Sequence, residues 1–406
     1  MAAKVHVIVG AGQAGANAAV AMREAGFDGR IVLIGEEPHA PHERPPLSKA
    51  ALTEDPEPEP SWFFPPEKFS AHDIELRLGV RVESLDPANR TVALADGTAQ
   101  SFDRLLLATG ARARQLPVPG AEHVLLLRTL DDARRIRARL LPGTRVACIG
   151  AGVIGLETAS SAHARGCRVT VLEAAAGAMG RAMSPAMARW VERLHRARGV
   201  DLHFGASITA IEPGRVLCAD GLVVEADLVI AGIGVVRNTE IAQAAGLEVD
   251  GGIDVDEFGR AGMPNIYAAG DVAAFWHPTL QRRLRLESWK HAQNHGIAVG
   301  RAMAGVAEQY EDIPWYWTDQ FGVTIQVAGM PHDAAATVLR GEETAHSFAA
   351  FHLDAAGRVV AATGVNAARE VRAGISMIEK RLAPDPAKLA DPSVKLQALL
   401  KELQTS

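Results

Sequence analysis

The chain has 406 residues, of which 48% are hydrophobic and 22% charged, and its formal net charge is −6. This composition is typical of a globular protein, and the length predicts two or three domains, each able to bury a core. The negative charge gives no support for nucleic-acid binding by the molecule as a whole. No apolar run reaches the roughly 18 residues that a membrane span needs, so we expect neither nucleic acid nor membrane as a partner.

The first expected element is a strand over residues 5–9, which runs into the glycine motif Gly10-Ala-Gly12-Gln-Ala-Gly15. A helix to about residue 26 and a strand over 31–34 follow, and that strand ends at Glu36. In such a motif the first glycine permits a tight turn, the second lets a pyrophosphate approach the backbone, and the third lets helix and strand pack closely. An acid at this spacing can hold ribose hydroxyls. The segment therefore predicts a dinucleotide site.

Turn-forming residues dominate residues 36–66, which include Arg44-Pro-Pro-Leu-Ser-Lys49. Proline cannot donate a hydrogen bond to a strand ladder, so we expect an excursion from the sheet here. Short strands are expected over 75–85, 91–94 and 104–108, the last ending in Ala108-Thr109-Gly110.

The same layout then repeats. After a helix over about 130–141, a strand over 145–149 runs into Gly150-Ala-Gly152-Val-Ile-Gly155. A helix to about 165 and a strand over 168–172 follow, with Glu173 at the strand end. One glycine motif alone is weak evidence, but two in a full strand–turn–helix–strand context predict two bound dinucleotides. Further strands are expected over 202–211 and 216–219, before an apolar strand that ends in a small-residue turn at Gly234.

The chain returns to the first repeat at Ile266-Tyr-Ala-Ala-Gly-Asp271, so the second repeat is inserted in the first. From Pro314, alternating strands over 324–328, 347–353 and 359–365 precede helical segments. The predicted fold class is α/β, with two Rossmann-like dinucleotide-binding domains, the second inserted in the first, and a C-terminal α+β domain. The expected domains are 1–112 with 237–313, then 113–236, then 314–406.

The three cysteines, Cys148, Cys167 and Cys218, are widely spaced in apolar contexts. This usage predicts a reducing compartment, and the first strand begins too early to leave room for a signal peptide, so we expect a cytoplasmic protein. No cysteine pair follows the first ribose acid, which excludes relay of electrons through a dithiol. His291 and His295 are four residues apart without a third ligand, so we expect core or interface histidines and no metal site.

Four motifs carry a resemblance to a known family: Arg44-Pro-Pro-Leu-Ser-Lys49, Ile154-Gly-Leu-Glu157, Ala269-Gly-Asp271 and Pro314-Trp-Tyr-Trp-Thr-Asp-Gln320. Their order and spacing extend over almost the whole chain. The chain resembles the two-dinucleotide flavoprotein reductases of glutathione-reductase-like architecture. More closely, it resembles the ferredoxin and rubredoxin reductases that serve bacterial oxygenases. It departs from many of these relatives at His42, where they have a tyrosine.

The resemblance implies that the first repeat binds FAD. The first glycine motif and its acid would hold the pyrophosphate and the adenosine ribose, and Asp271 would hydrogen-bond the ribityl chain or a phosphate. The implied FAD contacts are Gly10, Gly12, Ala14, Gly15, Glu36, Arg44, Lys49, Val82, Ala108, Thr109, Gly110, Arg128, Asp271, Glu287, Ser288 and Trp289.

The second repeat would bind the nicotinamide dinucleotide. A carboxylate at Glu173 accepts a hydrogen bond from an adenosine 2′-hydroxyl and repels a 2′-phosphate, which favours NADH over NADPH. Arg181 tempers this expectation, because a nearby arginine can accommodate that phosphate. The implied contacts are Gly150, Gly152, Val153, Ile154, Gly155, Glu173, Arg181 and Gly234.

Lys49 and Glu157 are the expected catalytic residues. The resemblance places Lys49 beside flavin N5, where a cation stabilises the electron density of reduced flavin and can orient the nicotinamide. Glu157, from the second glycine-motif helix, is its expected partner in a bridge between two domains.

The implied activity is reduction of a ferredoxin by NADH. Hydride would pass from NADH to flavin N5, and electrons would leave one at a time to a 2Fe-2S ferredoxin that feeds an oxygenase. Three scattered cysteines cannot supply a cluster, so the cluster belongs to the partner. Arginines at 134–139 and at 282–285 are candidates for docking an acidic ferredoxin or are solvated surface. Two other functions stay open: an NADH oxidase or quinone reductase, and a flavoprotein whose association is controlled by NADH. The sequence predicts neither the particular ferredoxin and oxygenase nor the oligomeric state.

Overall fold

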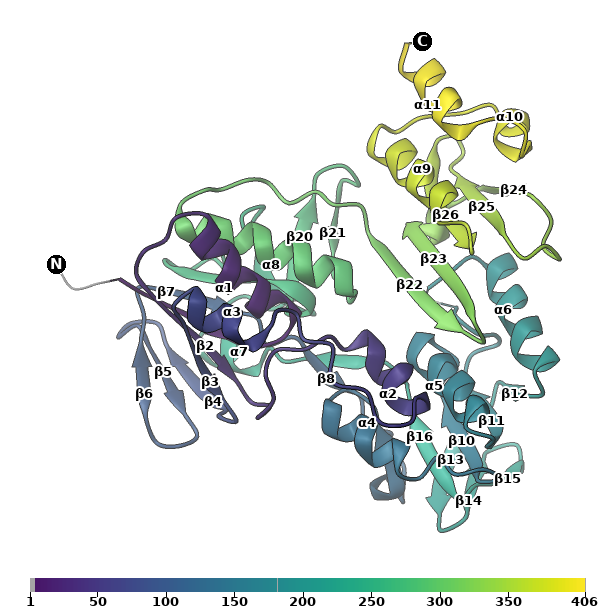
Figure 1. Cartoon of the computed structure of the whole chain (residues 1–406), viewed down its shortest axis with the longest axis horizontal. Coiled ribbons are helices and arrows are strands. Elements are labelled where there is room, and N and C mark those ends of the chain that lie inside the picture. Colours follow the sequence, from purple (N-terminus) through teal and green to yellow (C-terminus); the bar gives the residue numbers. More distant parts are fainter. Residues whose placement is uncertain (1–3, 181, 406) are drawn as a thin grey trace. The chain divides into compact units, whose positions relative to one another are not determined.

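The computed structural model describes residues 4–180 and 182–405, which form two compact units (Figure 1). Unit 1 consists of residues 4–45, 59–112 and 235–312. Unit 2 consists of residues 46–58, 113–234 and 313–405, so the short segment 46–58 folds with the second repeat. Among the helices within the described ranges, none is both long and apolar enough to cross a membrane.

Unit 1 is built around a five-stranded parallel sheet. Its strand order is β19-β7-β1-β2-β3, with bounds β1 (Val5–Val9), β2 (Arg30–Gly35), β3 (Ile74–Leu78), β7 (Arg104–Leu107) and β19 (Ile266–Ala268). The central strands are apolar almost throughout because both sheet faces are covered. Parallel strands end at the same edge, so the loops after β1, β2, β7 and β19 are neighbours there.

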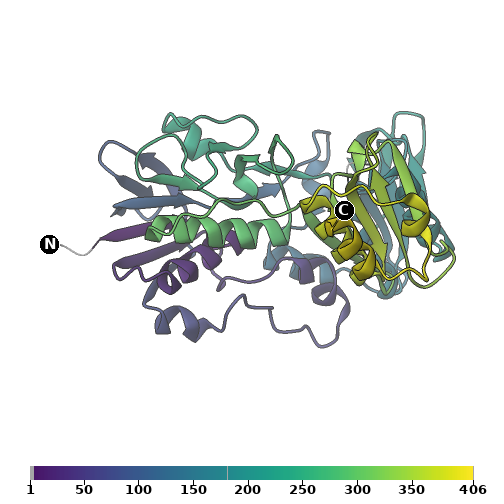
Figure 2. The ribbon, with the colours of Figure 1, turned by 90° about the horizontal axis from the view of Figure 1, so that it is seen from above.

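Two helices of unit 1, α1 (Gln13–Glu24) and α8 (Trp289–Ala304), pack closely against each other (Figure 2). A Cβ at Gly296 would overlap the carbonyl oxygen of Ala14, and one at Gly300 would meet that of Ala18 at 2.5 Å. The glycines of α8 therefore let the two backbones approach. This contact fixes the start of α1, which carries the first glycine motif.

The remaining elements of unit 1 lie around this sheet. They include the antiparallel sheet β4-β5-β6 and the mixed sheet β18-β20-β21, in which β18 and β20 run parallel. Their bounds are β4 (Val82–Asp86), β5 (Thr91–Leu94), β6 (Ala99–Ser101), β17 (Val235–Arg237), β18 (Ile253–Val255), β20 (Ala273–His277), β21 (Arg282–Leu284), α3 (Pro66–Ala71) and α7 (Glu240–Ala244).

Unit 2 repeats the parallel sheet of unit 1. Its order, β12-β11-β10-β16-β9, is that of unit 1 read in reverse, except that β9 occupies the edge position that β19 takes in unit 1. The strands are β9 (Val124–Leu126), β10 (Arg145–Ile149), β11 (Arg168–Glu173), β12 (Asp201–Phe204) and β16 (Leu228–Ala231). An antiparallel sheet of β13 (Ile208–Glu212), β14 (Arg215–Cys218) and β15 (Val223–Glu225) again accompanies the parallel sheet. The Rossmann-like repeat predicted from the glycine motifs is confirmed.

Two strand predictions were wrong, at the same place in each repeat. The run 75–85 is two strands, β3 and β4, which belong to different sheets, and the run 202–211 is likewise β12 and β13. Gly79 and Gly205 lie at φ +72° and +70°, so the chain turns there. Because the apolar residues continue on both sides of each glycine, their pattern concealed the turn.

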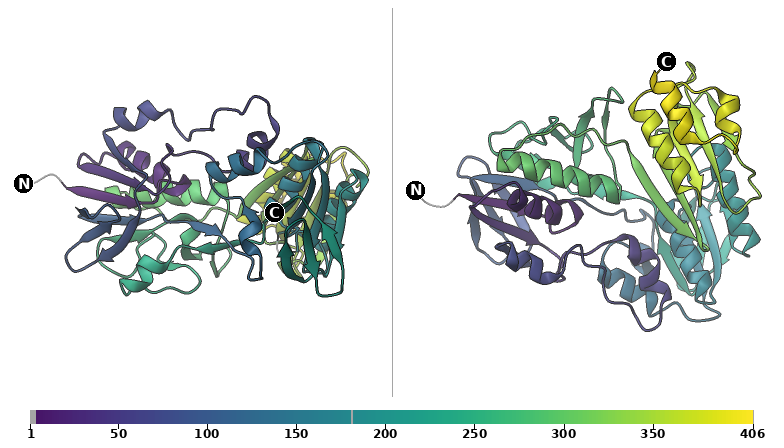
Figure 3. Two further views of the ribbon diagram at one scale, coloured as in Figure 1. Left: turned by 90° about the horizontal axis from the view of Figure 1, so that it is seen from below. Right: turned by 45° about the horizontal axis from the view of Figure 1, so that its top comes forward.

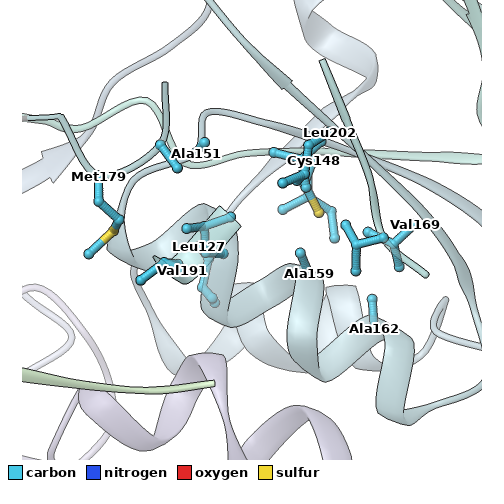
Figure 4. Close-up of a cluster of buried hydrophobic side chains, with 14 of the residues drawn as sticks. Leu127, Cys148, Ala151, Ala159, Ala162, Val169, Met179, Val191 and Leu202 are labelled. Carbon is cyan, nitrogen blue, oxygen red and sulfur yellow. The ribbon is translucent and has the colours of Figure 1, made fainter. Parts of the chain in front are cut away.

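Short helices complete the second repeat. The helices are α2 (Ala50–Thr53), α4 (Leu130–Arg137), α5 (Val153–Ala164) and α6 (Pro185–Ala197), and a short strand β8 (Ala111–Ala113) lies between α2 and α4 in the sequence. α4 begins with a capping box between Thr129 and Asp132 and ends at Arg137, earlier than the predicted 141. Small residues of α5 let the helix pack on the sheet, as Ala159 and Ala162 do beside Cys148 and Val169 (Figure 4).

All three cysteines are free and buried. Burial raises the pKa of the Cys148 thiol to about 12 and also raises the pKa values of Cys167 and Cys218. Because the thiolate is the reactive form, these side chains are packing residues.

The C-terminal part of unit 2 is an antiparallel sheet covered by helices (Figure 3). The sheet order is β22-β23-β26-β25-β24. The bounds are β22 (Trp315–Gln320), β23 (Val323–Gly329), β24 (Ala336–Arg340), β25 (Phe348–Leu353), β26 (Val359–Val365), α9 (Ala368–Glu379), α10 (Pro386–Ala390) and α11 (Leu396–Thr405). The buried guanidinium of Arg340 donates to the carbonyl oxygens of Leu389 and Val394, which holds the segment between α10 and α11. The α+β character of this region is confirmed.

Candidate functional site

The first glycine motif forms a turn that is closed toward the sheet. Gly10 lies at φ +112°, and a Cβ there would overlap the carbonyl oxygen of Ala108. A Cβ at Gly15 would overlap the carbonyl oxygen of Gly10, whereas at Gly12 it would find open space among the described atoms. No described side chain caps α1 or places an acid in its first turn. The first amides of α1 can therefore bind an anion, and this cradle fits the pyrophosphate of FAD.

Other expected FAD residues gather at the same sheet edge. Ala108, Thr109 and Gly110 follow β7, and Asp271 follows β19, whose Ala268 is in register with Leu107 of β7. Gly270 lies against the start of α1, since a Cβ there would come within 2.8 Å of the Ala14 Cβ. The structure thus brings Asp271 beside the first glycine motif.

Two residues that the sequence reasoning missed hold these loops. Asn238 donates from Nδ2 to the carbonyl oxygen of Thr109 (2.9 Å) and accepts from the Thr109 hydroxyl at its own carbonyl (2.7 Å). Arg237 donates to the carbonyl oxygen of Asp271 (2.8 Å) and pairs with Glu287 (2.6 Å). The signal available in the sequence was their position where the chain leaves the second repeat: Arg237 ends β17, and Asn238 follows it directly.

The start of α8 carries the segment 287–289. The Ser288 hydroxyl accepts from the amide of His291 (3.3 Å) and caps the helix. Trp289 is the first helical residue. The cap leaves the following amides at the N-terminus of a long helix, where negative charge is favoured.

Three further expected FAD residues lie outside the glycine motif and the loops after β7 and β19. The Glu36 carboxylate is exposed, and Arg81 lies 3.7 Å from it. Arg44 donates to Glu37 (2.8 Å), and Val82 is buried at the start of β4. His42, the residue that departs from the family pattern, is buried. Desolvation lowers the pKa of the His42 imidazole.

Two of the expected FAD residues belong to the other unit. Lys49 and Arg128 belong to unit 2, where the Arg128 amide donates to Asp132 at the start of α4. Arg181 lies outside the described residues.

The second glycine motif has the same construction. Gly150 lies at φ +99°, and a Cβ there would come within 2.6 Å of the Gly232 carbonyl oxygen. Val153 and Ile154 begin α5, and the Ile154 side chain is 41% exposed, unusual for isoleucine. Gly234 lies at φ +94° beyond the end of β16. The turn fits a second dinucleotide.

Glu173 is fixed at the end of β11. Its carboxylate accepts from the amides of Ala151 (2.7 Å) and Ala175 (2.8 Å). Since Ala151 lies inside the glycine motif, these bonds hold the acid beside the turn that would receive the pyrophosphate. Glu173 thus differs from the exposed Glu36. In the strand register Glu173 corresponds to Gly35, and Glu36 lies one residue further along the chain.

Lys49 and Glu157 form an ion pair within unit 2. The distance from Lys49 Nζ to Glu157 Oε1 is 2.9 Å, and the Glu157 side chain is 2% exposed. The carboxylate also accepts from the hydroxyls of Ser48 and Thr318, the latter at 2.7 Å. A buried charge is costly unless it is paired and hydrogen-bonded, and here it is both. The pair was expected to bridge two domains, but segment 46–58 places both residues in one unit.

Strand β22 completes the surroundings of Lys49. The Trp317 ring centre lies 5.9 Å from Nζ, and Asp319 Oδ2 lies 4.0 Å from it. Ser48, Thr318 and Asp319 were not predicted as site residues. They occur in two of the motifs that carry the family resemblance, which was the signal that could have found them.

The arginine clusters are largely compensated inside the protein. Arg134 pairs with Glu57, Arg137 with Asp55 and Arg135 with Asp132. In unit 1, Arg283 pairs with Asp254 and Arg285 with Asp250. These contacts reduce the free positive charge that either cluster offers to an acidic partner.

His291 and His295 are core histidines, as predicted. Both are at most 2% exposed, and the His291 ring stacks on Phe275. His291 Nδ1 lies 3.0 Å from the Tyr310 hydroxyl, and His295 Nδ1 accepts from the amide of Gly270 (3.2 Å). Within residues 4–180 and 182–405, no group of three or more His, Cys, Asp or Glu side chains could hold a metal ion.

Acid is expected to destabilise unit 1 through these histidines. Burial lowers the pKa of His291 to about 4, against the opposing effect of Asp271 and Asp312. Burial and the neighbouring His291 both lower the pKa of His295, to well below its ordinary value. A neutral histidine stabilises the fold above pH 6.5, and this contribution is lost as the pH falls toward 4 because the unfolded chain binds the proton more readily. Between pH 7.5 and pH 5, the temperature at which the flavin is released should therefore fall about 5 °C less in His291→Phe than in the parent protein.

The control for this experiment is His123→Phe, at an exposed histidine. An equal acid loss in His291→Phe and the parent would contradict the assignment.

Comparisons with known proteins agree with this geometry. A family model described as pyridine nucleotide-disulphide oxidoreductase matches residues 4–296, and one described as reductase C-terminal matches residues 315–400. The chain belongs to the pyridine nucleotide-disulphide oxidoreductase family. Its curated relatives within that family include oxygenase-system reductases.

The chain is 39% identical to the ferredoxin–NAD(+) reductase component of the anthranilate 1,2-dioxygenase system of Burkholderia cepacia, over 98% of this chain and 100% of that protein. It is 37% identical to putidaredoxin reductase of Pseudomonas putida, over 97% and 96% of the two chains. The crystal structure of the covalent putidaredoxin reductase–putidaredoxin complex matches with a TM-score of 0.95 and 35% identity, over 100% of both chains. The resemblance and the fold class predicted from the sequence are confirmed.

Proposed function

We propose that this oxidoreductase uses FAD to oxidise NADH and passes electrons one at a time to a 2Fe-2S ferredoxin that feeds an oxygenase. The observation that carries the proposal is the Lys49–Glu157 pair: a cation held by a buried carboxylate on α5, the helix that begins at the second glycine motif. When bound, FAD accepts a hydride from NADH and returns electrons singly.

The protein's own residues bind, orient and stabilise charge. The turns at Gly10 and Gly150 would hold the two pyrophosphates, and Glu173 would accept from the adenosine ribose of NADH. The Lys49 ammonium would stabilise negative charge that develops during hydride transfer, and Glu157 would keep that ammonium in place. We assign FAD to residues 1–112 with 237–313, NADH to 113–236, and a separate C-terminal domain to 314–406.

Electrons must reach an external acceptor without a thiol stage. Every cysteine in the chain is buried and has a raised pKa, so none is poised to relay electrons. The relatives named above are ferredoxin reductase components, and one structural match is a complex with putidaredoxin, which supports a ferredoxin as the acceptor. Free, buried cysteines also support a location in the reducing cytoplasm.

Anaerobic stopped-flow with the purified holoprotein tests the proposal. We expect NADH to bleach the flavin rapidly and a 2Fe-2S ferredoxin to restore its colour rapidly. Rapid bleaching with oxygen or quinone accepted and several ferredoxins ignored would instead indicate an oxidase or quinone reductase. Slow bleaching with a long-lived reduced complex would indicate a protein whose association is controlled by NADH.

A further inference from the structure

A chain of buried hydrogen bonds leads away from Glu157 into the interior of unit 2. Thr318 Oγ1 lies 2.7 Å from Glu157 Oε1, Gln320 Nε2 lies 3.0 Å from Thr318 Oγ1, and His195 Nε2 lies 2.7 Å from Gln320 Oε1. These four residues are between 0% and 2% exposed. These hydrogen bonds thus connect α5, β22 and α6 without access to solvent.

The carboxylate fixes the direction of every bond in this chain. An ionised carboxylate can only accept, so the Thr318 hydroxyl must donate its single proton to Glu157. The Thr318 oxygen then accepts from the Gln320 amide nitrogen, which turns the Gln320 carbonyl oxygen toward His195. That oxygen needs a donor, so His195 carries a proton on Nε2.

The local structure explains why these residues meet. Thr318 and Gln320 are two residues apart on β22 and therefore point to the same face, whereas Trp317 and Asp319 point to the other. The His195 ring is also held edge-on against Phe321, with ring centres 4.9 Å apart. The Phe321 amide in turn donates to the Ser160 hydroxyl of α5 (2.8 Å).

Burial supports a neutral His195. Desolvation lowers the pKa of its imidazole, and it outweighs the hydrogen bond to Gln320, which acts to raise that pKa; nearby His163 adds to the lowering. Nδ1 of His195 is buried and has no hydrogen-bond partner among the described residues, so a second proton there would be unsatisfied. The Nε2–H tautomer is the form that satisfies Gln320.

We propose that His195 and Gln320 are positioning residues that act through Thr318 on the Lys49–Glu157 pair. Thr318 and Lys49 both bind Oε1 of Glu157. By holding the Thr318 hydroxyl, Gln320 therefore helps to fix the carboxylate oxygen that binds the Lys49 ammonium. If Gln320 did not hold it, the Thr318 hydroxyl could rotate away and release the carboxylate. This inference rests on the proposed function, in which the Lys49 ammonium assists hydride transfer.

Gln320→Met keeps the length of the side chain and removes both hydrogen-bonding groups. We expect the rate of flavin bleaching at saturating NADH to fall about tenfold, with NADH affinity and flavin content unchanged. In a Glu157→Gln background the same change should have less than a twofold further effect, because residues acting through one group are not additive. Equal effects in the two backgrounds would overturn the proposal.

Two substitutions of His195 separate hydrogen bonding from packing. His195→Gln can present an amide N–H near the position of Nε2 and should keep the parent rate within about twofold, whereas His195→Phe keeps a ring against Phe321 but should show the tenfold loss. Gln397→Met, at an exposed position on α11, is the control for introducing methionine. Loss of rate in both His195 variants, or in neither, would contradict a role for the donor.

A spectroscopic measurement tests the chain without any turnover. Long-range ¹H–¹⁵N spectra of the histidine-labelled protein should show His195 protonated on Nε2, and Gln320→Met should change that signal. A proton on Nδ1 would overturn the proposal. If NADH fails to reduce the parent protein, the proposed function fails, while the tautomer still decides whether this hydrogen-bond chain exists.

Discussion

Flavin reduction by NADH is expected to slow about a hundredfold in Lys49→Met, because the ammonium that would stabilise the developing negative charge is lost. Flavin content should stay the same, since the glycine turn, Asp271 and the Arg237 contacts lie in unit 1. The measurement is the anaerobic bleaching rate at saturating NADH.

A matched control for this substitution is Lys68→Met. Lys68 Nζ also lies over an aromatic ring, that of Phe64, at 4.1 Å, but on α3 in unit 1. The flavin of Lys68→Met should bleach at the parent rate. A Lys49→Met rate within twofold of the parent would remove Lys49 from the hydride-transfer site.

The same substitution should also lower stability. It leaves the Glu157 carboxylate buried without its cation, at a cost of up to about 3 kcal/mol. The double variant Lys49→Met with Glu157→Gln should regain part of this loss, because no buried charge remains. Thermal unfolding of the parent, Lys49→Met and the double variant would separate this structural effect from the effect on the bleaching rate.

Glu173→Arg is expected to shift the preference between NADH and NADPH about a hundredfold toward NADPH, since it removes a repelling carboxylate and adds a donor for a 2′-phosphate. The measurement is the ratio of kcat/KM for the two nucleotides. An unchanged ratio would exclude Glu173 from the ribose site.

The structure adds a requirement to this experiment. Glu173 accepts from two backbone amides, and an arginine leaves both without an acceptor. Glu173→Gln keeps one acceptor oxygen and should give a smaller shift with the glycine turn intact. The control is Glu192→Gln, at an acid in the same unit that also accepts a backbone amide, that of Ala178 (2.9 Å), and it should leave the ratio unchanged.

The nucleotide-binding repeats could be read from the sequence because their requirements are local. A glycine at φ +112° or +99° is needed whatever surrounds the turn, so the motifs at Gly10 and Gly150 predict strand, turn and helix directly. The strand prediction from the local apolar pattern was wrong at Gly79 and Gly205, because apolar residues continue on both sides of the point where the chain passes from one sheet to another. Pairing between strands decides such a break, and the pattern of a single strand does not record it.

The surroundings of the Lys49–Glu157 pair show what only tertiary structure decided. The sequence by itself, through its likeness to a family, indicated that this lysine and this glutamate act together. It did not indicate that Glu157 is buried, that segment 46–58 folds with the second repeat, or that Thr318, Gln320 and His195 continue the hydrogen bonds inward. Except for the bond between Gln320 and Thr318, those contacts join residues more than a hundred positions apart along the chain. They form because burying a carboxylate requires donors from every element packed around it, and that requirement arises only when the elements come together.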